Sequence, residues 1–426
     1  MTTAGTDGAG NGGTAHGTGG SSSGNGGSGS GSGSGSKGPE LVELVELTSI
    51  RDAEADRWNA LAGDAALYST HRWLLYGEEL ADAGSRHLVA APGGSYTVGL
   101  PTHRFTGEVP HFYDPAVLFP GAAEPATPER PLLLGGTRLG YTSEVIVAPG
   151  TAEPLAAAGV RTVLDRFRAL GADDGGLAAL LYLTDESVER LLPHLGPRDQ
   201  VVMMDATAVL PVDPDGLEGY RRRFTSHQFT SIRREMRRYT DTGCRTEVKR
   251  LSECHHLLGP LSAQVLIRYG HPVTDESESE RFAQQASLFD DNCRILGAYQ
   301  GDRMVGFTQY FFWGNTMYAR SHGLDDSIAR EAKLYFNLTY YEAVKYAAAH
   351  GYHCVDLSCD AFQAKVSRAA RLQPLWGVVL DAPWTGPALE RVRAEERARR
   401  QEYASHDPGI ESRVARLVDA RARDRA

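Results

Sequence analysis

Three things are scarce in this 426-residue sequence, and each scarcity excludes a class of protein. Cysteine occurs only five times, an odd number with no Cys-x-x-Cys spacing, which argues against a disulfide framework and a structural zinc site. Apolar runs stay well below the roughly 18 residues that a membrane helix needs. The first residues lack a basic segment followed by an apolar one, so we expect no signal peptide. These absences predict a cytoplasmic protein with no metal and no membrane partner.

Basic residues are concentrated in one segment of an otherwise acidic chain. The formal net charge is −10, but residues 220–250 contain ten Lys or Arg against three acids. An acidic protein with one basic segment is not a general binder of nucleic acid, although such a segment can anchor phosphates locally.

The composition changes along the chain and divides it into four parts. Residues 1–38 are almost entirely Gly, Ser, Thr and Asn, which predicts a disordered tail because nothing apolar repays its ordering. The length that follows suits two α/β domains, which we place at 39–202 and 203–387. Residues 388–426 alternate charges with Ala and few large apolar residues, which predicts a solvated helix or a partly frayed tail.

The first domain shows a mixed pattern of helices and strands. Residues 105–138 are rich in Pro and Gly and predict long surface loops. The remaining periodicities predict helices at 53–61, 70–83 and 160–170, and strands at 41–47, 87–91, 96–101 and 178–183.

The second domain has a clearer pattern. Residues 226–242 predict an amphipathic helix, with Phe229, Ile232, Met236 and Tyr239 on its apolar stripe and Gly243 at its end. A helical region at 253–269 comes next, followed by three strands at 293–299, 304–312 and 316–322 with tight turns between them. One long helix at 330–350 and a strand at 353–357 follow. Helix, three-stranded meander, helix and strand is the core order of the acetyltransferase fold.

These segments resemble the GNAT-like domain of FemAB-like transferases. The residues that carry the likeness are the helix Ser226–Arg238, the meander from Gly297 to Arg320, the run Tyr340–Ala347, and Val355-Asp356-Leu357-Ser358 followed by Phe362–Arg368. Leu67-Tyr68-Ser69-Thr70 and Trp73-Leu74 are similar to the opening of the first domain in this group. The resemblance implies two tandem GNAT-like domains with mixed sheets, an aminoacyl-tRNA donor, and no metal or nucleotide cofactor. It also implies a small-molecule amine as acceptor, as in relatives of antibiotic pathways that move a seryl group from tRNA onto an alkylhydroxylamine.

One departure from the acetyltransferase pattern bears on the donor. Enzymes that use acetyl-CoA carry a Q/R-x-x-G-x-G/A loop whose N–H groups bind pyrophosphate. Here the segment His322–Lys333 has one glycine and the adjacent acids Asp325 and Asp326, which disfavours CoA. A CoA-dependent N-acetyltransferase, a peptidoglycan-bridge aminoacyltransferase and a non-catalytic binding protein remain alternatives. No coiled-coil arm of the bridge enzymes is visible between Gly243 and Asp290.

The expected chemistry is attack of an amine on an ester, which needs a base, oxyanion stabilisation and a grip on phosphates. Lys365 matches the family's Phe-x-x-Lys motif and is a candidate to stabilise the oxyanion or to bind the terminal phosphate of the tRNA. The alternative is that it is a surface lysine that caps a helix. Tyr318, Arg320 and His322 alternate along one strand, which predicts a shared face. His322 can accept a proton near neutral pH, and Asp325, Asp356 and Asp360 are the carboxylate alternatives. The predicted catalytic residues are Lys365, His322 and Asp360. The predicted substrate-binding residues are Tyr318, Arg320, Asp325 and Arg368. The predicted tRNA-binding residues are Arg233, Arg234, Arg237 and Arg238. The four arginines could equally form a solvated face with Glu235 paired along the helix.

Overall fold

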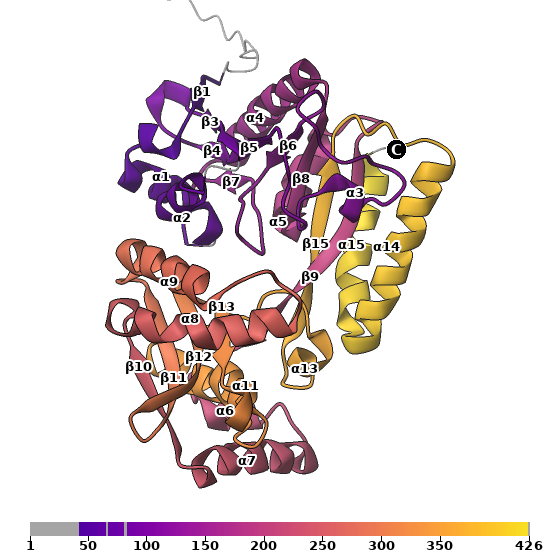
Figure 1. Cartoon of the computed structure of the whole chain (residues 1–426). Helices are drawn as coiled ribbons and strands as arrows, with labels where there is room; N and C mark the ends of the chain where they lie inside the picture. The colour runs from indigo at the N-terminus through magenta and orange to yellow at the C-terminus, as the bar shows by residue number, and fades with distance from the viewer. Residues whose placement is uncertain (1–41, 65–66, 81–82, 425–426) are drawn as a thin grey trace, which may run out of the picture. The chain divides into compact units, whose positions relative to one another are not determined.

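Two β-sheets organise the part of the chain that the structure describes. The computed structural model describes residues 42–64, 67–80 and 83–424, so the predicted tail at 1–38 lies outside the described residues. The smaller sheet runs β1 (Leu44–Leu47), β3 (His87–Ala90), β4 (Val98–Leu100) and β7 (Ile146–Val147). The larger sheet runs β10 (Cys244–Lys249), β11 (Cys293–Gln300), β12 (Arg303–Trp313), β13 (Thr316–Leu324), β14 (Cys354–Asp356), β9 (Gln200–Pro211), β15 (Arg371–Val379), β8 (Leu177–Leu183), β6 (Leu132–Gly135), β5 (Thr102–Phe105) and β2 (Gly84–Ser85) (Figure 1).

The same order of elements occurs in both halves of the larger sheet. In the second half β11, β12 and β13 form an antiparallel meander, and the chain then passes through helix α12 (Glu342–Ala349) to β14, which is parallel to β13. In the first half β5 and β6 are antiparallel, and helix α4 (Glu153–Asp174) leads to β8, which is parallel to β6. The predicted fold class, α/β with mixed sheets, is confirmed.

Strand β15 joins the two halves of the sheet. It pairs antiparallel with β9 on one edge and with β8 on the other. Sequence analysis did not predict this strand, which belongs to the range assigned to the second domain although β8 belongs to the first. Its partners are about 170 to 200 residues away in the chain, so no local pattern reveals the pairing. The domain boundaries at 202 and 203 stay a prediction.

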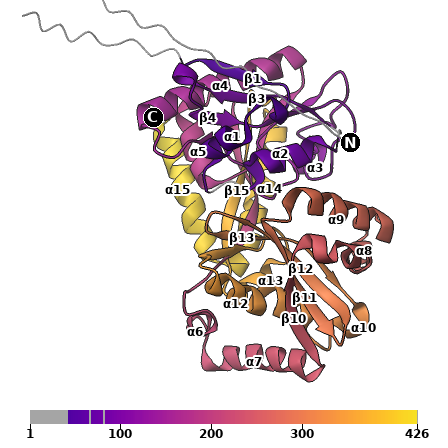
Figure 2. The same ribbon diagram turned by 90° about the vertical axis from the view of Figure 1, so that its left-hand side faces the viewer.

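The helices of the second half cover both faces of the meander. Helix α7 (Ser226–Asp241) begins at a capping box of Thr225 and Gln228 and buries Ile232 and Tyr239, as its apolar stripe predicts. Helices α8 (Leu251–Arg268) and α9 (Asp275–Phe289) pack together, and α8 contacts β13 (Figures 1 and 2). The remaining helices of this half are α6 (Leu217–Arg221), α10 (Asp326–Ala329), α11 (Leu334–Phe336) and α13 (Phe362–Val366).

The predicted continuous helix at 330–350 is wrong. Lys333 has a left-handed backbone (φ 55°), α11 is short, and Asn337–Tyr341 form a π-helical segment before α12. The Tyr310 hydroxyl donates to the carbonyls of Leu338 (3.1 Å) and Thr339 (3.2 Å). A side chain of strand β12 therefore binds two backbone carbonyls of the π-helical segment. Tertiary hydrogen bonds of this kind favour a π-bulge over a regular helix.

The first half has helices α1 (Ala55–Ala62), α2 (His71–Glu78), α3 (Pro115–Leu118), α4 and α5 (Asp185–Leu191). The prediction that 105–138 is only surface loop is wrong, because β6 inside it is fully buried between β5 and β8.

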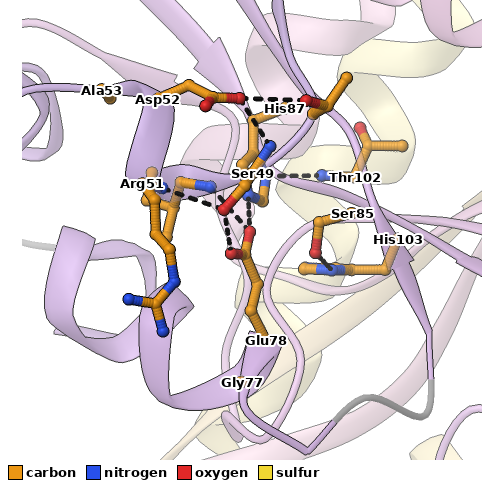
Figure 3. Close-up of polar contacts among 12 residues, drawn as sticks. Ser49, Arg51, Asp52, Ala53, Gly77, Glu78, Ser85, His87, Thr102 and His103 are labelled. Atoms are coloured by element: carbon orange, nitrogen blue, oxygen red, sulfur yellow. Dashed lines mark hydrogen bonds and ion pairs between the residues drawn. The ribbon is translucent and has the colours of Figure 1, made fainter.

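A cluster of polar residues connects the beginning of the first half to α2 (Figure 3). The Glu78 carboxylate accepts from Ser49 Oγ (2.6 Å), Ile50 N (2.8 Å) and His87 Nε2 (3.0 Å), with His103 next to His87. Burial opposes ionisation of Glu78, but these bonds lower its pKa to about 2.

The C-terminal region is helical, as one of the two predictions has it, but its helices pack against the sheet and are not simply solvated or frayed. Helices α14 (Pro387–His406) and α15 (Gly409–Asp424) lie side by side against β9 and β15 (Figure 1). They bury Val392, Tyr403, Ile410, Val414 and Leu417. Glu396 accepts the Met203 N–H (2.9 Å) and the Tyr403 hydroxyl donates to Asp205 (2.8 Å). Side chains of α14 therefore satisfy backbone groups of β9 that no neighbouring strand pairs.

Candidate functional site

The candidate site lies where β13 and β14 separate. The two strands pair over three residues only, from Thr316 with Cys354 to Tyr318 with Asp356. Beyond Tyr318, β13 has a bulge against β12: Tyr310 faces Ala319 and Gln309 faces Ser321, so Arg320 is the extra residue. Bulges redirect side chains and end regular pairing, so this one leaves an opening between the strands.

The bulge also contradicts the prediction that Tyr318, Arg320 and His322 share one face. Tyr318 lies 5.6 Å from the ring of Tyr68, and the Arg320 guanidinium lies 4.3 Å from the ring of Tyr141. His322 instead faces Tyr335, at 5.4 Å, on the side of the π-helical segment. Strict alternation predicts one face, but an inserted bulge residue shifts the alternation by one position.

Lys365 is buried, with 4% of its surface exposed, so it is not a surface lysine that caps a helix. Its Nζ donates to the carbonyl oxygens of Ser358 (3.0 Å) and Cys359. The loop that supplies these carbonyls has three non-glycine residues with left-handed backbones: Ser358 (φ 60°), Asp360 (φ 65°) and Ala361 (φ 48°). Such strained backbone persists only where surrounding contacts hold it, and Lys365 supplies two of them.

The lysine has charged neighbours on several strands. Burial lowers the pKa of Lys365 to about 8, although Cys359, Asp356, Asp360 and Asp205 act in the opposite direction. Asp356 accepts from Thr207 Oγ1 (2.9 Å) and from the Ser358 N–H (2.7 Å), and its burial raises its pKa. An ammonium has three donors, and two of those on Lys365 bind the loop, so one can bind a substrate oxygen.

His322 is a weaker base in the folded protein than the sequence suggests. Burial, together with the positive charges of Lys365 and Arg268, lowers its pKa to about 4. His322 is therefore neutral at pH 7 and stays neutral into mildly acidic conditions. Arg320 and His322 are enclosed by protein atoms on most sides and are still partly reached by solvent, as is typical of side chains that line a recess.

Three predicted site residues are engaged elsewhere. Asp325 is the N-cap of α10, where its Oδ1 accepts from Ser327 N (2.9 Å) and Ser327 Oγ (2.6 Å), and it pairs with Arg303. Asp360 is exposed and lines a surface pocket beside α14 with Phe362 and Tyr403. Arg368 binds Glu235 of α7 through two hydrogen bonds of 2.7 and 2.9 Å. The structure thus places Tyr318 and Arg320 on the side of Tyr68 and Tyr141, and His322 within electrostatic range of Lys365, while Asp325 and Arg368 make structural contacts.

The four arginines of α7 are all exposed, and none forms an ion pair with a residue that the structure describes. The expectation that Glu235 pairs with the arginines along the helix is wrong, because its carboxylate forms an ion pair with Arg368, which lies outside α7. Arg233, Arg234, Arg237 and Arg238 therefore keep their charges available for another molecule.

Residues of the first half that the sequence did not single out complete the site. Arg320 Nη2 donates to the Leu139 carbonyl (2.7 Å), which brings the segment between β6 and β7 to β13. Tyr68, Tyr141 and Glu144 reach the same region. Tyr68 stood in the family-like opening, but Tyr141 and Glu144 lie in an irregular segment with no periodic pattern, so no sequence signal marks them.

Part of this chain is similar to a known protein family. Residues 226–366, the part that carries the meander, the opening and Lys365, match the family model described as acetyltransferase (GNAT) domain. The match covers about a third of the chain and supports a GNAT-type fold for that stretch. No curated protein matches the sequence. Acyl transfer on a GNAT fold is the coarse functional class that this domain supports.

Solved structures share the fold of this chain over most of its length. FemX superposes with a TM-score of 0.53 at 11% identity, covering 80% of this chain and 98% of FemX. The C-terminal domain of a lysylphosphatidylglycerol synthetase from Agrobacterium fabrum, described as putative, gives 0.51 at 9% identity, covering 82% and 96%. At such identities the likeness concerns the fold alone. Within the described residues, none of the helices combines the length and apolar character that crossing a membrane requires.

Proposed function

We propose that the protein transfers an aminoacyl group from aminoacyl-tRNA to the amine of a small molecule, as a step of natural-product or antibiotic biosynthesis. The tRNA donor and the pathway come from the resemblance to FemAB-like transferases. The GNAT domain and its opening between β13 and β14 supply the acyl-transfer scaffold.

The choice of donor rests on the residues at the N-terminus of α10. CoA-dependent GNAT enzymes bind pyrophosphate at the helix that follows the fourth core strand. Here the Asp325 carboxylate already accepts the N–H and hydroxyl of Ser327 at that position, and Asp326 follows it. Asp325 and Asp326 also form ion pairs with Arg303 and Arg268, so this position is already occupied by side chains, and α10 has only four residues. The position therefore favours a donor other than CoA.

The residues around the opening suit aminolysis of an ester. Arg320 uses one of its five donors for Leu139, and Lys365 uses two of three for the loop, so both can bind the carbonyl oxygen or the terminal phosphate of the donor. Positive groups placed where negative charge develops stabilise the tetrahedral intermediate. Tyr318 lies on the same side of β13 as Arg320, and His322 is within electrostatic range of Lys365.

Helix α7 is the surface for the tRNA backbone in this proposal. Its four exposed arginines are free of ion pairs within the described chain, and Glu235 fixes the helix to Arg368, three residues after Lys365. A donor bound along α7 can thus reach Lys365 with its 3′ end. Phosphate contacts of this kind position a nucleic acid without reading its sequence.

The decisive experiment uses the full chain, total aminoacylated tRNA and a panel of primary amines, with the amide product measured by mass spectrometry. We expect a product that depends on charged tRNA and disappears after RNase treatment. A product formed from acetyl-CoA alone and resistant to RNase would replace this proposal with the CoA-dependent alternative.

A further inference from the structure

Glu144 occupies a fixed position at the edge of the candidate site. The backbone on both sides of it is tied to β8 and α5: Ser143 N donates to the Tyr182 carbonyl (2.8 Å), Thr184 N to the Ser143 carbonyl (3.2 Å), and Val145 N to Ser187 Oγ (3.1 Å). Glu144 therefore cannot swing away with its segment.

Within the part of the chain that the structure describes, the Glu144 carboxylate has no hydrogen-bond or ion-pair partner. No residue of the described chain donates a hydrogen bond to it or forms an ion pair with it, and the side chain is still enclosed by protein and partly reached by solvent. Enclosed carboxylates are normally paired, because an unpaired buried charge is costly. An exception at the edge of a reactive opening indicates that the partner is a ligand.

The charged and titratable groups that face Glu144 come from two elements. Helix α5 presents Glu186 and Arg190, which pair with one another, and β13 presents Tyr318. Burial, and then the negative charge of Glu186, raise the pKa of Glu144 to about 7, although Arg190 acts in the opposite direction. A carboxyl group with such a pKa can both bind an ammonium and accept its proton near neutral pH.

We propose that Glu144 is the acceptor site: its carboxylate binds the ammonium group of the acceptor and removes one proton before the attack. The inference rests on the proposed function and assigns the acceptor to the first half of the molecule, opposite the cations Arg320 and Lys365 that bind the donor. Tyr318 connects the two sides, since its hydroxyl lies within electrostatic range of both Glu144 and Asp356.

The reaction then balances as follows. The ammonium transfers one proton to Glu144, and the neutral nitrogen attacks the ester carbonyl carbon of the aminoacyl group. This attack forms the C–N bond and the tetrahedral intermediate, and the ester C–O bond breaks as that intermediate collapses. The second nitrogen proton leaves with the ribose oxygen, which becomes a hydroxyl, and Glu144 later releases its proton to water.

The site also predicts the class of acceptor. Arg190 pairs with Glu186, so Glu144 is the carboxylate left for an ammonium at this edge, and an acceptor that carries a carboxylate or phosphate next to its amine is disfavoured. A cationic primary amine without a neighbouring anion is the matching substrate.

Two nucleophiles test the role in the complete protein. Ethanolamine is protonated at neutral pH and needs a base, whereas hydroxylamine is largely unprotonated and does not. With charged tRNA, Glu144→Gln is expected to lower kcat/KM for ethanolamine by about 10²-fold or more and to change the hydroxylamine reaction little. Equal rates of parent and variant with ethanolamine would overturn the inference. Absence of product with both nucleophiles in the parent would instead overturn the proposed function.

A second measurement does not depend on the donor. Carbon-13 NMR of the side-chain carboxyls, with Glu144→Gln to assign the signal, is expected to show titration of Glu144 near pH 7 and a shift of that signal when ethanolamine is added. Glu186→Gln is the matched control: it removes a neighbouring negative charge, so the Glu144 titration moves to lower pH while ethanolamine still reacts. Titration of Glu144 near the value of free glutamate, or no response to the amine, overturns the inference.

Discussion

Arg368 binds Glu235 through two hydrogen bonds and thereby attaches the arginine-bearing helix α7 to the segment that carries Lys365. The two side chains are 14% and 16% exposed, and the Tyr341 hydroxyl contacts both, accepting from Arg368 Nε at 2.8 Å and donating to Glu235. A shielded, bidentate pair with a third partner is more rigid than an exposed ion pair. This contact therefore holds α7 against the segment that carries Lys365, as the proposed donor site requires.

The arginine face is expected to bind phosphates without contributing to the fold. Arg233→Glu with Arg237→Glu leaves Ile232 and Tyr239 buried, so thermal unfolding should not change. Affinity for tRNA should fall, and the slope of log K against log salt should decrease by about one to two units, roughly 0.7 to 0.9 for each lost contact. Filter binding at several salt concentrations measures both.

The control for that pair is Arg391→Glu with Arg397→Glu on α14, the same change of charge at two exposed positions away from α7. It should alter tRNA affinity and the salt slope much less. Equal losses for the two double variants would show that only net charge matters and that α7 is a solvated face.

Lys365 is expected to affect turnover more than donor binding. Lys365→Met keeps the length of the side chain but removes the ammonium, so kcat at saturating tRNA should fall by about 10²-fold, the usual effect of losing one donor to an oxyanion. Lys365→Arg, which can still bind the Ser358 and Cys359 carbonyls, separates the two roles. If it restores stability but not kcat, the ammonium acts on the substrate; if Lys365→Met lowers stability but leaves kcat unchanged, only the structural role remains.

The stability of the protein should also depend on pH through Lys365. Its folded pKa of about 8 is below the ordinary value of 10.5, so between these values the unfolded chain binds the extra proton. Stability contributed by this group therefore rises as pH increases from about 8 towards 10.5. Denaturant unfolding of the parent and of Lys365→Met across this range should show the rise only in the parent.

Glu78 is expected to stabilise the first half of the molecule. Glu78→Gln weakens the bonds from Ser49, Ile50 and His87 and should lower the free energy of unfolding by about 1–3 kcal/mol. Because the folded pKa of about 2 is below the ordinary 4.5, this stability is present above pH 4.5 and is lost as pH falls towards 2. Glu129→Gln on the exposed loop is the control, and an equal effect of both variants would contradict the assignment.

The docking of the C-terminal helices can be tested at one hydrogen bond. Glu396→Ala leaves the Met203 N–H buried without an acceptor and should cost about 1–3 kcal/mol, whereas Glu395→Ala next to it should cost little. Chemical denaturation of the two variants gives the comparison. Similar stabilities would mean that α14 does not hold the edge of β9.

The amino-acid sequence by itself determined the elements whose patterns are local. The amphipathic helix α7, the meander β11–β13 with its glycine turns, and the mixed α/β class all follow from periodicity and turn residues within about 20 positions. Lys365 was found as a motif residue for the same reason.

Tertiary structure alone decided the rest, because its causes are contacts between distant segments. β15 exists as the partner of β8 and β9, and α14 packs because β9 presents unpaired backbone groups to it. The bulge at Arg320 turned His322 to the opposite face from Tyr318, and burial lowered its pKa. Glu144 became part of the site only because an irregular segment of the first half folds against β13, where desolvation and a neighbouring carboxylate change its chemistry. Charge and burial of this kind depend on what surrounds a side chain in space, which no spacing along the chain encodes.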